Sequence, residues 1–226
     1  MTEQQENPAA ARGPRPAMQA LAWALLVAVM AAVAGVAVMQ KMRAHGGPGL
    51  LDYGTVPAFS LTDQAGTPVS NETLAGAPYI IDFIFTRCAG QCPIMTARMK
   101  GVEKWLGEDG QDGVRLVSVT VDPDHDTTTV MAAFARKFEA DTSRWSFLTG
   151  TRAAIYSLAR DGFKLGVDDQ PASGTASAEE PIIHSNRFVL VDAKGAIRGY
   201  YTGLDPEDLD RLREELPALT GKRRGR

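Results

Sequence analysis

Apolar and polar positions alternate along most of the chain in a way that marks out strands and helices. Residues 79–85 and 114–121 are almost continuously apolar, which is typical of strands buried on both faces of a sheet. Apolar residues then recur at helical spacing over 94–106 and 127–140, and we expect Asp126 to cap the second of these helices. Strands that alternate with helices in this way predict an α/β fold.

Shorter segments complete the expected domain, which spans residues 57–217. Residues 58–62 and 68–70 flank a Gln-Ala-Gly turn and predict a hairpin. The other expected elements are a strand at 145–148, a helix at 153–161, a polar loop at 166–180, a second hairpin from 187–191 and 196–201, and a helix at 206–216. The sequence therefore predicts a mixed central sheet with helices on both faces.

The part of the chain before this domain has a different pattern. Residues 17–39 carry no charge, and a helix of that length crosses a hydrocarbon layer of about 30 Å. We predict a tail at 1–16, one transmembrane helix at 17–39 and a Gly-rich tether at 40–56. The alternative is a signal peptide cleaved at Ala-Val-Ala, residues 32–34. Basic residues are equally frequent on the two sides, so they do not fix the orientation.

Composition and charge exclude several classes of protein. The net charge of −3 argues against nucleic acid as the main partner, although residues 218–226 form a basic tail. The chain is long enough to bury a sizeable core without cross-links. It has only 2 cysteines, too few for a disulfide scaffold, so these residues are candidates for a functional role.

The two cysteines, Cys88 and Cys92, lie where the first buried strand gives way to a helix. The amino end of a helix presents free N–H groups and a partial positive charge, which favour a thiolate, and we expect Arg87 to act in the same direction. Pro93 suits the first helical turn. Thiolates on one face can form a redox disulfide or bind a soft ion such as Cu(I). A purely stabilising disulfide would gain little from so short a loop.

A metal held by two sulfurs needs a further donor, and the chain offers 3 histidines. His45 lies in the tether, where it is expected to be solvated. His125 lies in a turn before a helix and has the pattern of a surface or capping residue. His184 ends the polar loop, at the mouth of the second hairpin. Spacing along the chain does not show whether His184 meets the sulfurs.

Three motifs in the same order resemble the Sco (SenC) family. They are Phe85-Thr86-x-Cys88-x3-Cys92-Pro93, Val119-Thr120-Val121-Asp122-Pro123-x-x-Asp126-Thr127, and His184-Ser185 followed by Phe188-Val189-Leu190-Val191-Asp192. The resemblance covers residues 57–217. Sco proteins are thioredoxin-like, membrane-tethered proteins that serve cytochrome c oxidase assembly, so the resemblance implies a thioredoxin-like fold and a partner of that kind.

The resemblance also implies a mononuclear copper site, for Cu(I) or Cu(II), formed by Cys88, Cys92 and His184. It implies a single-pass protein of the cell (inner) membrane, with the tail 1–16 in the cytoplasm and the domain on the periplasmic or extracytoplasmic side. Asp122 and Asp126 match the family's acidic loop, which either orients the site or a partner, or simply forms a turn and a cap.

Two positions depart from the family pattern. Ala89 follows the first cysteine where proline is common, and His125 stands where arginine is common. Neither change removes a donor, but both leave open whether the target is an oxidase copper centre or another cuproprotein.

The sequence leaves two functions open. The first is a copper chaperone that delivers copper through Cys88, Cys92 and His184. The second is a thiol-disulfide oxidoreductase in which Cys88 attacks and Cys92 resolves the mixed disulfide. A peroxidase of the peroxiredoxin kind fits poorly, because Thr86 and Arg87 do not reproduce the surroundings that such a cysteine needs.

Overall fold

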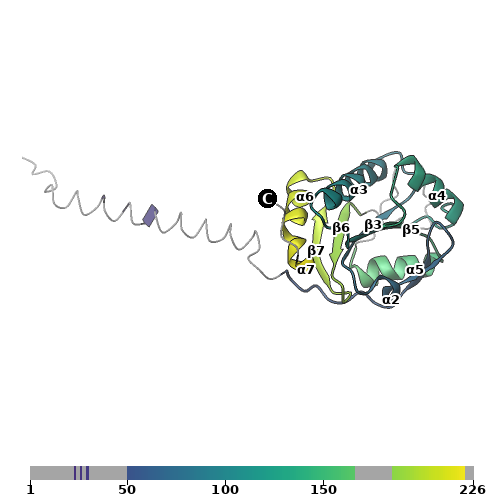
Figure 1. The fold of residues 1–226 in the computed structure, drawn as a ribbon, viewed down its shortest axis with the longest axis horizontal. Helices are drawn as coiled ribbons and strands as arrows, with labels where there is room; N and C mark the ends of the chain where they lie inside the picture. The colour runs from purple at the N-terminus through teal and green to yellow at the C-terminus, as the bar shows by residue number, and fades with distance from the viewer. Residues whose placement is uncertain (1–22, 24–25, 27–28, 31–49, 166–184, 222–226) are drawn as a thin grey trace, which may run out of the picture. The chain divides into compact units, whose positions relative to one another are not determined.

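The computed structural model describes residues 23, 26, 29, 30, 50–165 and 185–221 of the 226-residue chain (Figure 1). Its largest feature is one mixed sheet of five strands in the order β5-β4-β3-β6-β7. The central strand β3 (Tyr79–Ile84) runs parallel to β4 (Arg115–Thr120), which is parallel to β5 (Trp145–Leu148). On its other side β3 pairs antiparallel with β6 (Arg187–Val191), and β6 pairs antiparallel with β7 (Ile197–Thr202).

These strand directions bring three chain segments to one edge of the sheet. The carboxyl ends of the parallel strands β3 and β4 share an edge, and the amino end of β6 lies there because β6 runs the opposite way. Three segments therefore lie at these strand ends: the segment that contains both cysteines, the acidic loop after β4, and residues 185–186 before β6.

The expected helices are present, together with two that the pattern did not predict. In chain order they are α2 (Asn71–Leu74), α3 (Gln91–Glu108), α4 (Thr128–Lys137), α5 (Arg152–Ser157), the π-helix η1 (Leu158–Gly162), α6 (Pro206–Glu215) and α7 (Pro217–Thr220). The short helix α2 was not predicted. It begins with a capping box in which Ser70 and Thr73 each satisfy the other's backbone N–H.

Side chains of β3 alternate between two cores, as the pleat of a strand requires. On one face, Ile80 and Ile84 pack with buried residues of α3, α4 and α6. On the other face, Ile81 and Phe83 pack with α5, η1, α2 and the hairpin of β1 (Ser60–Thr62) and β2 (Pro68–Ser70). Figure 1 shows α3, α4 and α6 on one side of the sheet and α2 and α5 on the other. The predicted mixed sheet with helices on both faces is confirmed.

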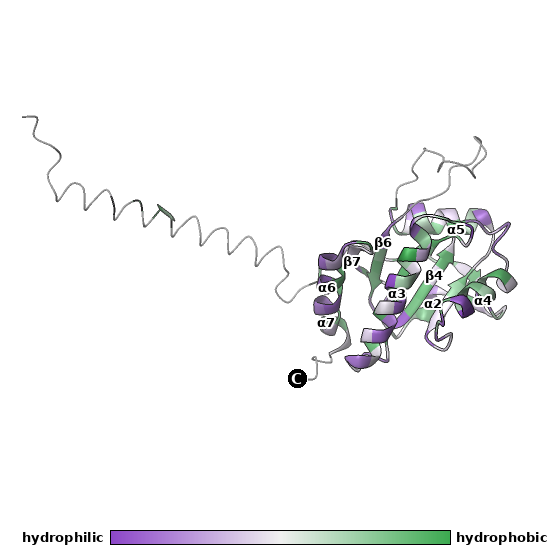
Figure 2. Ribbon diagram, turned by 90° about the horizontal axis from the view of Figure 1, so that it is seen from above, coloured by the Kyte–Doolittle hydropathy of each residue, from purple (hydrophilic) through white to green (hydrophobic). Residues whose placement is uncertain are grey.

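Hydropathy follows the same layers. Figure 2 shows the strands β4 and β6 as a hydrophobic centre, with hydrophilic residues on α4 and α6. The largest side chains with almost no exposed surface include Trp145, Phe147 and Phe188, all on strands. Burial of a phenylalanine side chain contributes about 1.5–3 kcal/mol, so these residues stabilise the packing of the sheet against its covering helices.

Two helix starts differ from the expectation. Helix α3 begins at Gln91 rather than 94, so it includes Cys92 and Pro93. Helix α4 begins at Thr128, and its N-cap is Thr127, whose side chain accepts the N–H of Val130. The prediction that Asp126 caps this helix was wrong, because its carboxylate instead accepts the N–H of Thr86 and the hydroxyl of Thr120.

Residues just before the predicted domain pack beside β7, an outer strand of the sheet. The N–H groups of Tyr53 and Val56 donate to the carbonyls of Ile197 and Gly195 at 3.0 and 2.9 Å, beside β7. Val56 is buried in the core. The end of the predicted tether is therefore held against β7.

The predicted tail 1–16 and residues 222–226 of the predicted basic tail lie outside the described residues, whereas residues 218–220 of that predicted tail belong to α7. Of the predicted transmembrane helix at 17–39, the structure describes only Trp23, Leu26, Val29 and Met30, which are helical and have exposed side chains. Within the described residues, no helix combines the length and the apolar character needed to cross a membrane.

Candidate metal centre

The two cysteines lie side by side at the amino end of α3. Cys88 precedes the N-cap residue Gly90, and Cys92 lies in the first turn. The N–H of Cys92 donates to the Sγ of Cys88 at 3.5 Å. Both thiols are free and half-buried, packed against the core on the α5 face of the sheet. The pair is therefore placed to act together.

The sulfur of Cys88 takes the role that a capping side chain normally has. Gly90 offers no side chain, and no side-chain cap bonds to the first turn of α3. The free N–H groups of that turn are satisfied in part by the sulfur of Cys88. Because a thiolate is a better acceptor than a thiol, this arrangement favours the ionised form of Cys88.

The pKa of Cys88 is accordingly lowered. Burial alone would raise it, but the backbone N–H groups of Cys92, Gly90 and Gln91 and the thiol of Cys92 together outweigh burial. The pKa of Cys92 is raised, first by burial, and then by the neighbouring Cys88 and the carboxylate of Asp82. The two thiols are therefore chemically unequal.

We expect Cys88 to be alkylated much faster than Cys92 at neutral pH, because the thiolate is the reacting form and only Cys88 is stabilised as a thiolate. The reduced full-length chain would be treated with a limiting amount of iodoacetamide, and the labelled cysteine identified by peptide mass spectrometry. We expect at least about tenfold preference for Cys88. Equal labelling, or a preference for Cys92, would contradict the described geometry.

Arg87 does not act on the sulfurs as the sequence suggested. Its Nε and Nη2 donate to Oδ2 of Asp122 at 3.0 and 2.6 Å, so its charge is directed to the acidic loop after β4. The favourable field at Cys88 comes from the helix backbone. Arg87 therefore connects the segment that leads to Cys88 with the acidic loop after β4.

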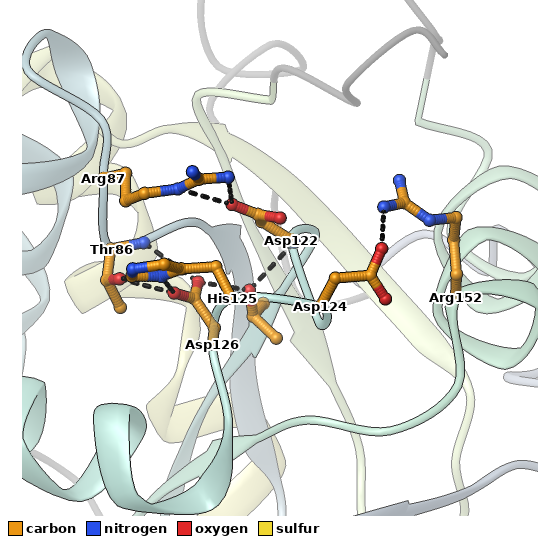
Figure 3. A network of polar contacts seen from close by, with 8 residues as sticks. Thr86, Arg87, Asp122, Asp124, His125, Asp126 and Arg152 are labelled. Atoms are coloured by element: carbon orange, nitrogen blue, oxygen red, sulfur yellow. Dashed lines mark hydrogen bonds and ion pairs between the residues drawn. The ribbon is translucent and has the colours of Figure 1, made fainter. Parts of the chain in front are cut away.

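A second group of possible donors lies beside this loop. Donor atoms of Asp122, His125 and Asp126 all lie within 4.8 Å of one another. The carboxylate of Asp126, however, already accepts three hydrogen bonds from Thr86 and Thr120, and Asp122 is paired with Arg87 (Figure 3). His125 is partly exposed, as expected, and its Nδ1 lies 2.8 Å from Asp126 Oδ1. The group is a hydrogen-bonded network, and the sequence had given no sign of its link to residue 86.

The third predicted donor, His184, lies outside the described residues. The chain is described again from Ser185, whose Oγ accepts the N–H of Arg187 at 3.2 Å. The N–H of Gly203 donates to the carbonyl of Asn186 at 2.8 Å, which joins this re-entry point to the end of β7. A Cβ on Gly203 would lie 2.7 Å from Cε of Met95, in α3. Asn186, just before β6, therefore lies near the first turns of α3.

Fold and site together define a thioredoxin-like protein with a dithiol where the central strand gives way to a helix. The chain belongs to the SCO1/SenC family, whose sequence model matches residues 51–219.

Solved structures of the family are similar to this chain. A SCO1/SenC family lipoprotein from Bacillus anthracis is 34% identical, with a TM-score of 0.64 over 74% of this chain and 95% of that one. BsSco, a member of the Sco family of cytochrome c oxidase assembly proteins in which a disulfide switch was identified, is 31% identical, with a TM-score of 0.62 over 77% and 98%. Bradyrhizobium japonicum ScoI with copper bound is 24% identical and shares the fold, with a TM-score of 0.57 over 71% and 99%.

Proposed function

We propose that this protein is a copper-binding chaperone that holds copper through Cys88, Cys92 and His184 and passes it to a cuproprotein, for which a subunit of cytochrome c oxidase is the first candidate. The observation that carries the proposal is the pair of adjacent free thiols at the amino end of α3. Membership of the family supports it, since ScoI from Bradyrhizobium japonicum was solved with copper and BsSco is a cytochrome c oxidase assembly protein.

The residues of the site fit copper as cargo. Thiolate sulfur is the protein donor that soft Cu(I) prefers, and imidazole suits both oxidation states. The lowered pKa of Cys88 supplies one thiolate without a large cost at neutral pH. A half-buried position leaves the sulfurs open to a partner, as ligand exchange between two proteins requires.

Two features support His184 as the third donor. It directly precedes Ser185, and the chain after Ser185 enters the sheet at the amino end of β6, the edge at which the cysteine loop opens. The proposed ligand set therefore requires the chain to extend by only one residue from Ser185, at most about 3.6 Å.

A thiol-disulfide oxidoreductase is the second candidate, and the unequal pKa values of the two cysteines favour it. In that reaction the Cys88 thiolate attacks a partner disulfide and releases one partner thiolate. The Cys92 thiol then loses its proton and attacks the Cys88 sulfur, which releases the second partner thiolate and leaves a Cys88–Cys92 disulfide. The partner gains two electrons and this protein loses two.

For the whole chain we propose a cytoplasmic tail at 1–16, a transmembrane anchor at 17–39 and a tether at 40–56. The Sco-type domain at 57–217 then lies on the extracytoplasmic side of the cell membrane and is followed by the basic tail 218–226. The exposed apolar side chains of Trp23, Leu26, Val29 and Met30 support the anchor. The lipoprotein nature of the relative from Bacillus anthracis supports membrane association in the family.

His184→Ala is the variant that separates the two candidate functions. Loss of a ligand should weaken copper binding by at least about 100-fold, because changing a residue that merely contacts a ligand already weakens binding by up to about 100-fold. Reduction of a model disulfide should continue, because that reaction uses only the sulfurs. Copper affinity would be measured by competition with a chelator and disulfide exchange in a separate assay, with His45→Ala as the matched histidine control. Unchanged copper affinity in His184→Ala would contradict the proposed ligand set.

A further inference from the structure

The carboxylate of Asp126 is fully buried and holds the chain segment that leads to Cys88. Its Oδ2 accepts the N–H of Thr86 at 3.0 Å and the hydroxyl of Thr120 at 2.6 Å. Its Oδ1 accepts the hydroxyl of Thr86 and lies 2.8 Å from Nδ1 of His125 (Figure 3). The backbone N–H and the side-chain hydroxyl of Thr86 are thus both bound to the carboxylate of Asp126.

This use of Asp126 is not the ordinary one for an acidic residue before a helix. The neighbouring Thr127 caps α4, so Asp126 is not required there. A buried carboxylate is costly to desolvate and persists only where hydrogen bonds compensate. Here the compensation comes mainly from Thr86, which lies 40 positions away in the sequence. The contact therefore joins the loop after β4 to the loop after β3.

The next residue of the same segment is held by the same acidic loop. Arg87 donates twice to Asp122, whose own N–H donates to the hydroxyl of Thr120 at 3.0 Å. The N–H of Cys88 then donates to the carbonyl of Phe85 at 3.3 Å. The residues between β3 and the first sulfur are consequently fixed one after another, and the acidic loop provides the fixed points.

We propose that Asp126 is a positioning residue for Cys88, which holds the sulfur against the free N–H groups of α3 by binding both the N–H and the hydroxyl of Thr86. Small displacements of the sulfur matter here because the hydrogen bonds that it accepts weaken steeply as their distance and angle change. The inference concerns the same dithiol on which the proposed function depends, and copper enters only one of its tests.

The main test compares Asp126→Asn with Asp124→Asn in the reduced full-length chain. Asparagine keeps the size of the side chain but removes its charge and replaces one acceptor oxygen with a donor group, so the charge-assisted hydrogen bonds from Thr86 are weakened. Asp124 lies in the same loop, is exposed and pairs with Arg152, as Figure 3 shows. We expect Asp126→Asn to lower the alkylation rate of Cys88 by about tenfold, with Cys92 still slow, and Asp124→Asn to leave both rates unchanged.

A second pair of variants keeps the test decisive if Asp126→Asn folds poorly. Thr86→Ser retains the N–H and the hydroxyl and should behave as the unaltered protein does. Thr86→Val keeps the shape but loses the hydroxyl, and it should slow Cys88 in the same way as Asp126→Asn. General loosening of the fold would instead expose Cys92 and speed its labelling, so a rise at Cys92 without a fall at Cys88 would overturn the proposal.

Copper provides an independent readout of the same geometry. We expect the thiolate-to-Cu(II) absorption of Asp126→Asn to shift or broaden relative to that of Asp124→Asn. If neither protein binds copper but the alkylation difference is present, the proposed function fails while the positioning role stands. If copper binds and Cys88 reacts at the same rate in all variants, the positioning role fails while the proposed function stands.

Discussion

Replacing Cys88 or Cys92 with serine is expected to abolish tight copper binding. A serine hydroxyl is a hard, weakly acidic donor, and it cannot replace a thiolate as a ligand of a soft ion. Each variant leaves one sulfur and at most one imidazole, so we expect affinity to fall by at least about 100-fold. Affinity would be measured by competition with a chelator on the full-length chain. Ala89→Ser is the matched control, because it adds the same hydroxyl to the same loop and removes no sulfur.

The two serine variants should differ in their thiol chemistry. Cys92→Ser leaves the reactive Cys88 without its neighbour, so when a small disulfide is added, Cys88 should attack it, release one small thiolate and accumulate as the mixed disulfide. Cys88→Ser leaves only Cys92, whose raised pKa should make it slow. Copper binding that survives in either variant would contradict a site built on both sulfurs.

The second large effect is a dependence of stability on pH that comes from Asp82. This residue of β3 is fully buried, and burial raises its pKa to about 7, although a hydrogen bond from Ser118 at 2.6 Å opposes the rise. Within the described residues, its Oδ2 has no hydrogen-bond partner. The indole of Trp145 donates to the hydroxyl of Ser118 at 3.0 Å, so Ser118 connects the carboxylate to the buried indole.

The direction of the effect follows from where the proton is held more tightly. The folded protein keeps the Asp82 proton up to about pH 7, whereas the unfolded chain loses it near the usual aspartate pKa of 3.8. Folding therefore takes up a proton in this window, and the free energy of unfolding falls as the pH rises from about 4 to about 7. A rise in pKa of this size corresponds to about 4 kcal/mol.

Asp82→Asn is expected to remove this fall. Relative to the unaltered protein, the variant should gain up to about 4 kcal/mol between pH 4 and pH 8, whatever constant cost the buried amide adds. Denaturant unfolding at several pH values would measure it. Asp192→Asn should behave oppositely: burial raises the pKa of Asp192, but hydrogen bonds from Ala196 and Arg198 lower it overall, so this carboxylate stabilises at neutral pH. An Asp82→Asn curve parallel to that of the unaltered protein would contradict a buried proton at residue 82.

Local pattern was sufficient for most of the fold. Continuous apolar runs identified β3 and β4, and turn residues identified both hairpins, because these signals arise within a few residues. The helix α2 was missed although Ser70 and Thr73 carry its capping box, since the helix is only 4 residues long and has no apolar periodicity.

The site was predicted less completely, for a physical reason. Asp126 and Thr127 are both good helix caps, and nothing local decides between them. Thr86, which follows β3, donates its N–H to Asp126, and Thr127 therefore caps α4. Arg87 was assigned to the sulfurs because it is adjacent to Cys88, yet its partner Asp122 is 35 positions away. Contacts of this range depend on the sheet order, which the sequence pattern does not reveal.

The capping role of Cys88 shows the same limit. A spacing of four residues places two sulfurs on one helical face only if the helix includes both, but α3 begins after Cys88, and the sulfur of Cys88 instead accepts the N–H of Cys92. The expected effect of a helix start is found at Cys88, whose pKa is lowered, but not at Cys92, whose pKa is raised because burial outweighs it.

The most direct test of the proposed function is a copper titration of the reduced full-length chain followed by absorption and by metal analysis after gel filtration. We predict one copper per chain, with thiolate-to-Cu(II) charge-transfer absorption that is lost in the Cys88→Ser, Cys92→Ser double variant. A chain that retains no copper after gel filtration, or a double variant that retains as much copper as the unaltered protein, would contradict the assignment.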